Sequence, residues 1–348
     1  MRTGWIGWLC AGAALLMVGG RPGAGKAQEI PPDSPRYRVT DLGTLGGDES
    51  DAVEINDRGQ IVGASKLFFS MRKYHACLWE QGRKIDLGLL SGEPRETESW
   101  ANAINAGGTI VGVKSVQLDN DLFHPKMEDH AVLWEHGKML LLGGHALSET
   151  LIPNTINAAG TIAGIGAYKG HAVAFIYAGG RLTWLEGMKE ARGINTAGQV
   201  VGTTGTDACL WEHGKLVMLG MHGAASVIND RGEIAGTGAM TSGLPHAFLW
   251  RSGSATDLGA LGGVQSYALG LNQAGQVVGQ AEFSRTGDTQ RTHAFLYTGG
   301  KMLDLNTLVP PNSGWNLISA KAINDKGLIV GRGRIRGEEH AFLLTPVS

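Results

Sequence analysis

The amino-acid sequence predicts an all-β fold made of seven small antiparallel sheets, and three repeated segments carry this prediction. The form Ile-Asn-x-x-Gly-x-Ile-Val-Gly, with conservative variants, occurs seven times. A His-Ala-Phe-Leu-Trp segment or a variant follows each copy, and an Asp-Leu-Gly segment often follows that. Successive turn asparagines lie 49, 52, 38, 34, 43 and 52 residues apart, the length of a supersecondary unit with variable loops. The Asn-to-Gly turns are Asn56–Gly59, Asn105–Gly108, Asn157–Gly160, Asn195–Gly198, Asn229–Gly232, Asn272–Gly275 and Asn324–Gly327.

Each repeat resolves into four short apolar runs, which we call strands a to d. In the first repeat they cover Asp51–Ile55, Gln60–Ala64, Ala76–Glu80 and Lys84–Leu87. The a-to-b turn is strongly specified, because Asn bonds its own backbone and the Gly three residues later enters positive φ freely. Four antiparallel strands in about 40 to 50 residues are typical of a propeller blade. The sequence therefore predicts a seven-bladed β-propeller of four-stranded antiparallel blades.

Small residues and the chain ends fit this arrangement. Six repeats carry alanine four positions before the turn Asn, as expected where innermost strands crowd a central axis; Pro153 is the exception. The last repeat stops after His340–Leu344 without a strand d, whereas a d-like run, Tyr37–Leu42, precedes the first repeat. Pairing of this N-terminal strand into the last blade would leave no repeat incomplete. We therefore expect the ring to close in this way.

At these segments the sequence resembles the HAF-type extracellular repeat family, over about residues 37–345. The resemblance implies a location outside the cytoplasm and names no activity. Residues 1–27 independently predict a secretory signal, with Arg2, an apolar stretch Trp5–Val18 and a small-residue cleavage site at Gly25–Ala27. We expect a signal at 1–27, a linker at 28–36, a propeller at 37–348, and a secreted, extracellular or periplasmic monomer. An uncleaved anchor is the alternative, although the apolar stretch is shorter than a membrane span.

Charge and cysteine content exclude other classes. Removal of residues 1–27 takes away three basic residues and leaves 27 Lys and Arg against 32 Asp and Glu, a net charge of −5. This balance argues against nucleic acid as a partner. Cys77 and Cys209 hold the same position of strand c in the first and fourth repeats, far apart in a ring. They are predicted to be buried thiols and not a disulfide.

Loop length indicates where a ligand would bind. The a-to-b and c-to-d turns are short, whereas the b-to-c and d-to-a connections vary and emerge on one face. The longest b-to-c loops are predicted at Ser65–Tyr74, Val113–Asp129, Gln280–Thr292 and Arg332–Glu339. Those of repeats 6, 7 and 1 carry a basic sector formed by Lys66, Arg72, Lys73, Arg285, Arg291, Arg332, Arg334 and Arg336.

The basic sector has two interpretations. It could attract an anionic ligand such as an acidic polysaccharide, or nearby Asp48, Glu49, Asp51, Glu338 and Glu339 could cancel it into a mixed-charge rim. Two aromatic residues, Trp100 and Tyr267, stand at the mouth end of strand a and could stack on sugar rings or plug the channel. The predicted ligand-binding residues are Trp100, Tyr267, Arg72, Lys73, Arg332, Arg334 and Arg336.

Catalytic motifs are missing from the sequence. There is no Gly-x-Ser-x-Gly elbow, no His-Glu-x-x-His and no phosphate loop. An identical His in most repeats, as at His75 and His130, argues for a structural device that bonds the backbone, and the repeated tryptophans are predicted to fill the gaps between blades. We expect no metal and no cofactor.

Three functional hypotheses stay open. The leading one is a non-enzymatic propeller that binds a glycan, a peptide or a protein through its long-loop face. The second is an enzyme acting on acidic polysaccharide, for instance a lyase, with weak catalytic candidates Tyr74, Arg72, His124 and Arg334. The third is a structural component of the cell envelope.

Overall fold

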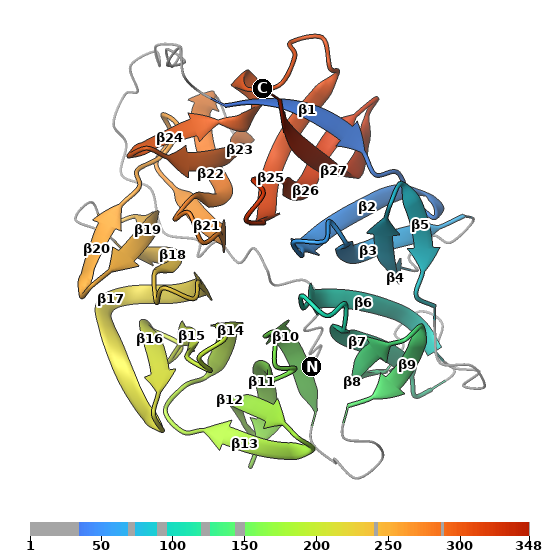
Figure 1. Ribbon diagram of the computed structural model, residues 1–348, viewed down its shortest axis with the longest axis vertical. Coiled ribbons are helices and arrows are strands. Elements are labelled where there is room, and N and C mark those ends of the chain that lie inside the picture. The colour runs from blue at the N-terminus through green and yellow to red at the C-terminus, as the bar shows by residue number, and fades with distance from the viewer. Residues whose placement is uncertain are drawn as a thin grey trace.

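The computed structural model describes residues 35–68, 74–88, 96–119, 126–142, 150–239, 243–286 and 289–347. These ranges contain 27 β-strands, a short 3₁₀ helix η2 (Leu305–Thr307) and no α-helix. The prediction of an all-β fold is confirmed. Figure 1 shows the sheets arranged around a common axis, each with its innermost strand beside that axis.

The strands pair antiparallel in groups of four, and we call each group a unit. Unit 1 consists of β2 (Gly46–Ile55), β3 (Ile61–Leu67), β4 (Tyr74–Glu80) and β5 (Arg83–Asp86). Unit 2 consists of β6 (Glu96–Ile104), β7 (Ile110–Gln117), β8 (Met127–Glu135) and β9 (Lys138–Leu141). Unit 3 consists of β10 (Leu151–Ile156), β11 (Ile162–Tyr168), β12 (His171–Ala178) and β13 (Arg181–Leu185). Unit 4 consists of β14 (Glu190–Ile194), β15 (Val200–Thr203), β16 (Asp207–Glu212) and the first part of β17 (Lys215–Ile228). Unit 5 consists of the rest of β17, β18 (Ile234–Ala239), β19 (Pro245–Arg251) and β20 (Ser254–Asp257). Unit 6 consists of β21 (Ser266–Leu271), β22 (Val277–Thr286), β23 (Thr289–Thr298) and β24 (Lys301–Asp304). Unit 7 consists of β25 (Trp315–Ile323), β26 (Ile329–Ile335), β27 (Glu338–Val347) and the N-terminal β1 (Arg36–Asp41).

Two junctions between units differ from a simple loop. Strand β17 is 14 residues long and serves two units, because it pairs first with β16 and then with β18. Strand β1 comes from the other end of the chain and pairs antiparallel with β27, from Arg36 opposite Val347 to Asp41 opposite Phe342. Figure 1 shows β1 beside β27, so the first and last described strands share one sheet.

The innermost strand of every unit carries a β-bulge next to the residue four positions before the turn Asn. In unit 1 the register shifts between Ala52 and Glu54, and the other units shift at the same place. The bulge brings the second glycine of the repeat against the backbone. A Cβ on Gly63 would lie 2.0 Å from the Asp51 carbonyl oxygen, and all seven equivalent glycines would have contacts of 1.9 to 2.3 Å. This close approach explains why each repeat needs a glycine there.

The turn asparagines form a closed cycle of hydrogen bonds. In the first turn Gly59 has φ 80°, and its N–H donates to the Asn56 carbonyl, so the predicted turn is confirmed. Each asparagine Nδ2 donates to the backbone carbonyl of the asparagine in the next unit, at 3.0 to 3.2 Å. Asn324 of unit 7 donates at 3.1 Å to Asn56 of unit 1, which completes the cycle.

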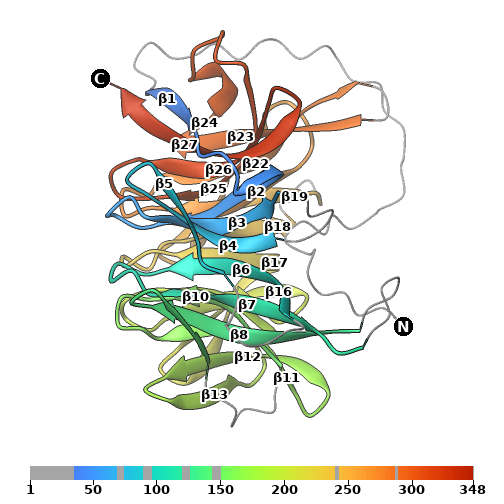
Figure 2. The same ribbon diagram turned by 90° about the vertical axis from the view of Figure 1, so that its right-hand side faces the viewer.

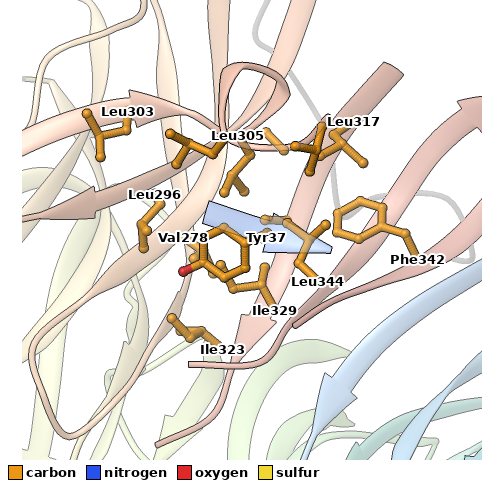
Figure 3. Packing of buried hydrophobic residues seen from close by; sticks show 14 residues of the cluster. Tyr37, Val278, Leu296, Leu303, Leu305, Leu317, Ile323, Ile329, Phe342 and Leu344 are labelled. Atoms are coloured by element: carbon orange, nitrogen blue, oxygen red, sulfur yellow. The ribbon is translucent and has the colours of Figure 1, made fainter. Parts of the chain in front are cut away.

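The hydrophobic core is divided into clusters that lie between neighbouring units. Trp79 and Trp134 are each 3% exposed, and Trp211 and Trp250 pack partly buried against such clusters, so the predicted position of the repeated tryptophans between units is confirmed. The six alanines before the bulges are buried, each in one of the clusters. Cys77 and Cys209 are buried free thiols, which confirms that prediction. Tyr37 of β1 is 3% exposed and packs in the cluster between units 6 and 7 (Figure 3). The N-terminal strand thus contributes to the core.

A recurring His–Asp pair fixes the end of strand d within a unit, and it corrects one prediction. The repeated His does not bond the backbone: His75 Nδ1 lies 2.9 Å from an Asp86 carboxylate oxygen, and His246, His293 and His340 pair likewise with Asp257, Asp304 and Asp41. The carboxylate also accepts from the backbone of its own turn, as Asp86 does from Gly88 at 2.7 Å. The imidazole therefore has the predicted structural role, but it binds the Asp carboxylate that holds the turn after strand d and does not bind the backbone.

The contacts between units 7 and 1 repeat those between units 1 and 2. Ser99 Oγ accepts from the Ala76 N–H and donates to the Gly88 carbonyl. Ser50 Oγ accepts in the same way from the Ala341 N–H at 2.9 Å and donates to the Gly43 carbonyl at 2.8 Å. The junction formed by the two chain ends is built like an internal one.

Candidate functional site

The side chains of interest lie where strands b and c begin and end on the face opposite the asparagine turns. Several predicted loops on this face are strands. Arg332 and Arg334 lie in β26 and Glu339 in β27, joined by a tight turn at Arg336 and Gly337, both at positive φ. Arg332 and Arg334 are two residues apart in β26, so their side chains share one face of the strand. Figure 2 shows the β22–β23 hairpin projecting on this side.

An aromatic pair stands at the junction of units 1 and 2. The rings of Tyr74, at the start of β4, and Trp100, in β6, are stacked with centroids 6.3 Å apart and an interplanar angle of 29°. Lys66 Nζ lies 5.7 Å from the Tyr74 ring centroid. Both rings are only partly buried. They offer an apolar surface edged by a cation.

Carboxylates neutralise the cation beside this pair. Lys66 Nζ lies 2.6 Å from Glu49 and 3.2 Å from Asp48. The Tyr74 hydroxyl donates to the other oxygen of Glu49. Burial alone would raise the pKa of Glu49, but the hydrogen bonds from Lys66 and Tyr74 outweigh it and hold that pKa below its usual value. Glu49 is therefore an ionised carboxylate that binds both Lys66 and Tyr74.

The arginines of unit 7 share another carboxylate. Arg332 Nη1 lies 3.3 Å from Glu339 and Arg334 Nη2 lies 2.9 Å from it. Glu49 and Glu339 stand opposite each other where β2 meets β27, so the two charged groups adjoin. Of the two interpretations of the basic sector, the described residues favour the mixed-charge rim, because Lys66, Arg332 and Arg334 each have a carboxylate partner. We call Glu49, Lys66, Tyr74, Trp100, Arg332 and Glu339 the mouth cluster.

The other predicted site residues are not brought into this cluster. Tyr267 is in β21 of unit 6, where its hydroxyl donates to Gln265 at 2.8 Å. Arg336 is exposed at the hairpin turn. Arg72, Lys73 and His124 fall outside the described residues, as does the predicted signal segment. The sequence placed Glu49 and Glu339 near the basic sector, but it gave no indication of which cation each carboxylate would bind.

The geometry does not favour the lyase chemistry. Burial, followed by the hydrogen bond to Glu49, raises the pKa of Tyr74 well above its usual range. A tyrosine base must lose its proton, so this environment opposes the role. Arg334, the described arginine among the candidates, is already bound by Glu339. Among the residues that the structure describes, no group of three or more His, Cys, Asp and Glu side chains is placed to hold a metal ion.

Comparison with known proteins gives one family match and several distant structures. A family described as "Protein of unknown function (DUF3466)" matches residues 257–343, which lie in units 5 to 7. No curated protein matches the sequence. No helix in the described part of the chain has the length and apolar character to cross a membrane.

The solved structures share little sequence with this chain. The β-propeller domain of the Trilobed protease from Pyrococcus furiosus is 12% identical, with a TM-score of 0.47, over 75% of this chain and 85% of that one. Pyrococcus horikoshii acylaminoacyl peptidase is 10% identical, with a TM-score of 0.47, over 74% of this chain and 45% of that one. A gluconolactonase from Xanthomonas campestris is 13% identical, with a TM-score of 0.38, over 94% and 99%. At such values the chemistry has to be argued from this chain's own residues.

Proposed function

We propose that this chain is a secreted, monomeric, seven-bladed β-propeller of the HAF-type extracellular repeat class, closed by its N-terminal strand. The pairing of β1 with β27 and the asparagine cycle support closure. The repeated contacts at the junction of units 7 and 1 support it as well. The apolar segment within residues 1–27 supports secretion. In this proposal the a-to-b turns form one rigid end of the ring, and the mouth cluster lies at the other.

We further propose that the protein is a non-enzymatic module that binds a glycan at the mouth cluster. The stacked Tyr74–Trp100 pair is the observation that carries this proposal. Sugar rings have one apolar face that packs on aromatic rings and a rim of hydroxyls that needs donors and acceptors. The carboxylates of Glu49 and Glu339, with Lys66 and Arg332, supply both kinds of group beside the rings.

The ion pairs also explain why binding is favoured over catalysis. A group that transfers protons has to be poised between two protonation states near neutral pH. The hydrogen bonds from Lys66 and Tyr74 lower the pKa of Glu49, and burial, followed by the hydrogen bond to Glu49, raises the pKa of Tyr74. Such a network fixes side chains in one geometry, which suits recognition.

A screen of immobilised oligosaccharides with the purified protein tests this function. Trp100→Ala should lose most binding, by about tenfold or more, because one face of the aromatic pair disappears. Tyr168→Ala is the matched control, since Tyr168 stacks on Trp184 in unit 3 with centroids 5.0 Å apart but lies outside the cluster. Binding that survives Trp100→Ala unchanged, or a protein that retains no glycan at all, would refute the proposal.

A further inference from the structure

We infer that a polar subsite at the junction of units 7 and 1 selects neutral sugar hydroxyls over the carboxylates of acidic polysaccharides. The subsite consists of Ser319, Arg332 and Asp51. This inference rests on the proposed function and names its ligand class: an uncharged, polyhydroxylated sugar whose adjacent hydroxyls bind beside the aromatic pair.

Four buried side-chain atoms of units 7 and 1 have no hydrogen-bond partner in the described part of the chain. One of them, His340 Nε2, lies 3.3 Å from a Glu338 carboxylate oxygen. The other three are Ser319 Oγ, Arg332 Nε and Asp51 Oδ1. Ser319 is itself only 1% exposed. A buried polar atom without a partner costs about 1 to 3 kcal/mol, so a protein seldom keeps three together without use. A ligand that supplies the missing partners recovers this free energy.

The strand register brings these residues together. Ser319 in β25 stands directly opposite Arg332 in β26, so their side chains leave the same face of the sheet. Arg332 is in turn opposite Ala341 in β27. The Ala341 N–H donates to Ser50 Oγ of unit 1 at 2.9 Å, and Asp51 is the next residue. The three atoms therefore belong to adjoining strands of two units at the same level of the ring.

The fold itself does not require polar residues at these positions. The pair equivalent to Ser319 and Arg332 is Trp100 and Val113 in unit 2, and Ile152 and Ile165 in unit 3. Apolar residues thus satisfy the same backbone geometry elsewhere. Unit 4 has a polar pair as well, Glu190 and Thr203, but their side chains have hydrogen-bond partners, whereas Ser319 Oγ and Arg332 Nε have none among the described residues.

The donors and acceptors match a sugar diol. A guanidinium N–H only donates, a carboxylate oxygen only accepts, and a serine hydroxyl does either. Two neighbouring sugar hydroxyls can donate to Asp51 and accept from Arg332 and Ser319. No change of protonation is needed for these bonds.

The charges disfavour an acidic sugar. Arg332 already faces Glu339 at 3.3 Å, and Lys66 is held by Glu49 and Asp48. A uronate carboxylate would find its cations occupied and would approach Asp51, Glu49 and Glu339. Repulsion by these groups, with little net positive charge to offset it, should weaken the binding of the acidic sugar.

Calorimetric titration with matched oligosaccharides tests the inference. The probes are hexamers of mannose and mannuronate, of galactose and galacturonate, and of glucose and glucuronate, because each pair differs only at C6. At least one neutral hexamer should bind about tenfold or more tightly than its acidic counterpart. Ser319→Ala and Asp51→Asn should each weaken that neutral hexamer by about five- to twentyfold. Exposed Ser254→Ala in unit 5 is the control and should change nothing. Thermal melting of each variant checks that it is folded.

The outcomes separate the inference from the proposed function. If Trp100→Ala abolishes binding but the acidic hexamers bind as tightly as the neutral ones, glycan binding stands and the neutral preference is refuted. If Ser319→Ala and Asp51→Asn are folded and bind like the wild type, ordered water alone serves these atoms and the subsite is refuted. If no hexamer binds and the broader glycan screen is also negative, the proposed function fails and the inference fails with it.

Discussion

Substitution of Asn324 by alanine should destabilise the protein as much as the same change at a turn between two units in the middle of the chain. Asn324 Nδ2 donates to the Asn56 carbonyl at 3.1 Å, and its Oδ1 accepts from the N–H groups of Lys326 and Leu328 at 3.1 and 3.0 Å. Three groups lose their partner, at about 1 kcal/mol each, so the expected loss is about 3 kcal/mol. For a chain of 348 residues that is a fall in melting temperature of about 4 °C.

The internal comparison is Asn157→Ala, because Asn157 makes the same three contacts, to the Asn195 carbonyl and from Ala159 and Thr161. Exposed Asn312→Ala is the control for loss of an asparagine side chain. Differential scanning calorimetry should give equal falls for Asn324→Ala and Asn157→Ala and almost none for Asn312→Ala. If Asn324→Ala melts together with Asn312→Ala, the bond that joins the last unit to the first contributes nothing and the argument for closure fails.

Three further predictions concern stability. Gly331→Ala should lower the free energy of unfolding, measured in urea, by about 3 kcal/mol, because its Cβ would lie 2.0 Å from the Ser319 carbonyl oxygen. An unchanged urea midpoint of unfolding would contradict this close approach of the two strands. Tyr37→Ala should cost about 3 kcal/mol because the ring is 97% buried, whereas Tyr37→Phe should cost far less; equal effects would show that packing of the ring is not what matters. Burial raises the pKa of Glu54 to about 7 from 4.5, so the folded state binds the proton more tightly, and stability should fall by about 3 kcal/mol as pH rises from 4.5 through 7. Glu54→Gln should remove that slope, and a slope that persists would assign it to other groups.

The repeat signature was sufficient to predict the strands because most positions that recur in every repeat have a local physical cause. The turn Asn satisfies the backbone of its own turn, and the first Gly takes the positive φ, so both are readable from neighbouring residues. The second Gly could be recognised as part of the repeat, but the reason for it could not be predicted from the sequence. The bulge that requires a glycine there depends on the partner strand. The histidine partner was missed for the same reason: Asp86 is 11 residues away and belongs to another strand.

The candidate site was predictable only in part. Trp100 could be selected because it stands at the mouth end of strand a, and Arg332 and Arg334 because they lie between strands b and c. Glu49 and Glu339 could be named as acidic residues near the basic sector, but their partners could not be predicted, because the pairing depends on β2 meeting β27 across almost the whole length of the chain. Charge counting over a linear sequence left a basic sector and a mixed-charge rim both open, whereas the three-dimensional register pairs the described cations Lys66, Arg332 and Arg334 with carboxylates. Long loops were also overestimated, since hairpins extended by a few residues keep strand pairing.

The position of a bound neutral oligosaccharide in a crystal of the complex tests the central claim most directly. The account predicts a sugar ring against Trp100, with hydroxyls in hydrogen-bond reach of Asp51, Ser319 and Arg332. A sugar bound at the asparagine turns, or on the mouth face away from units 7, 1 and 2, would contradict it.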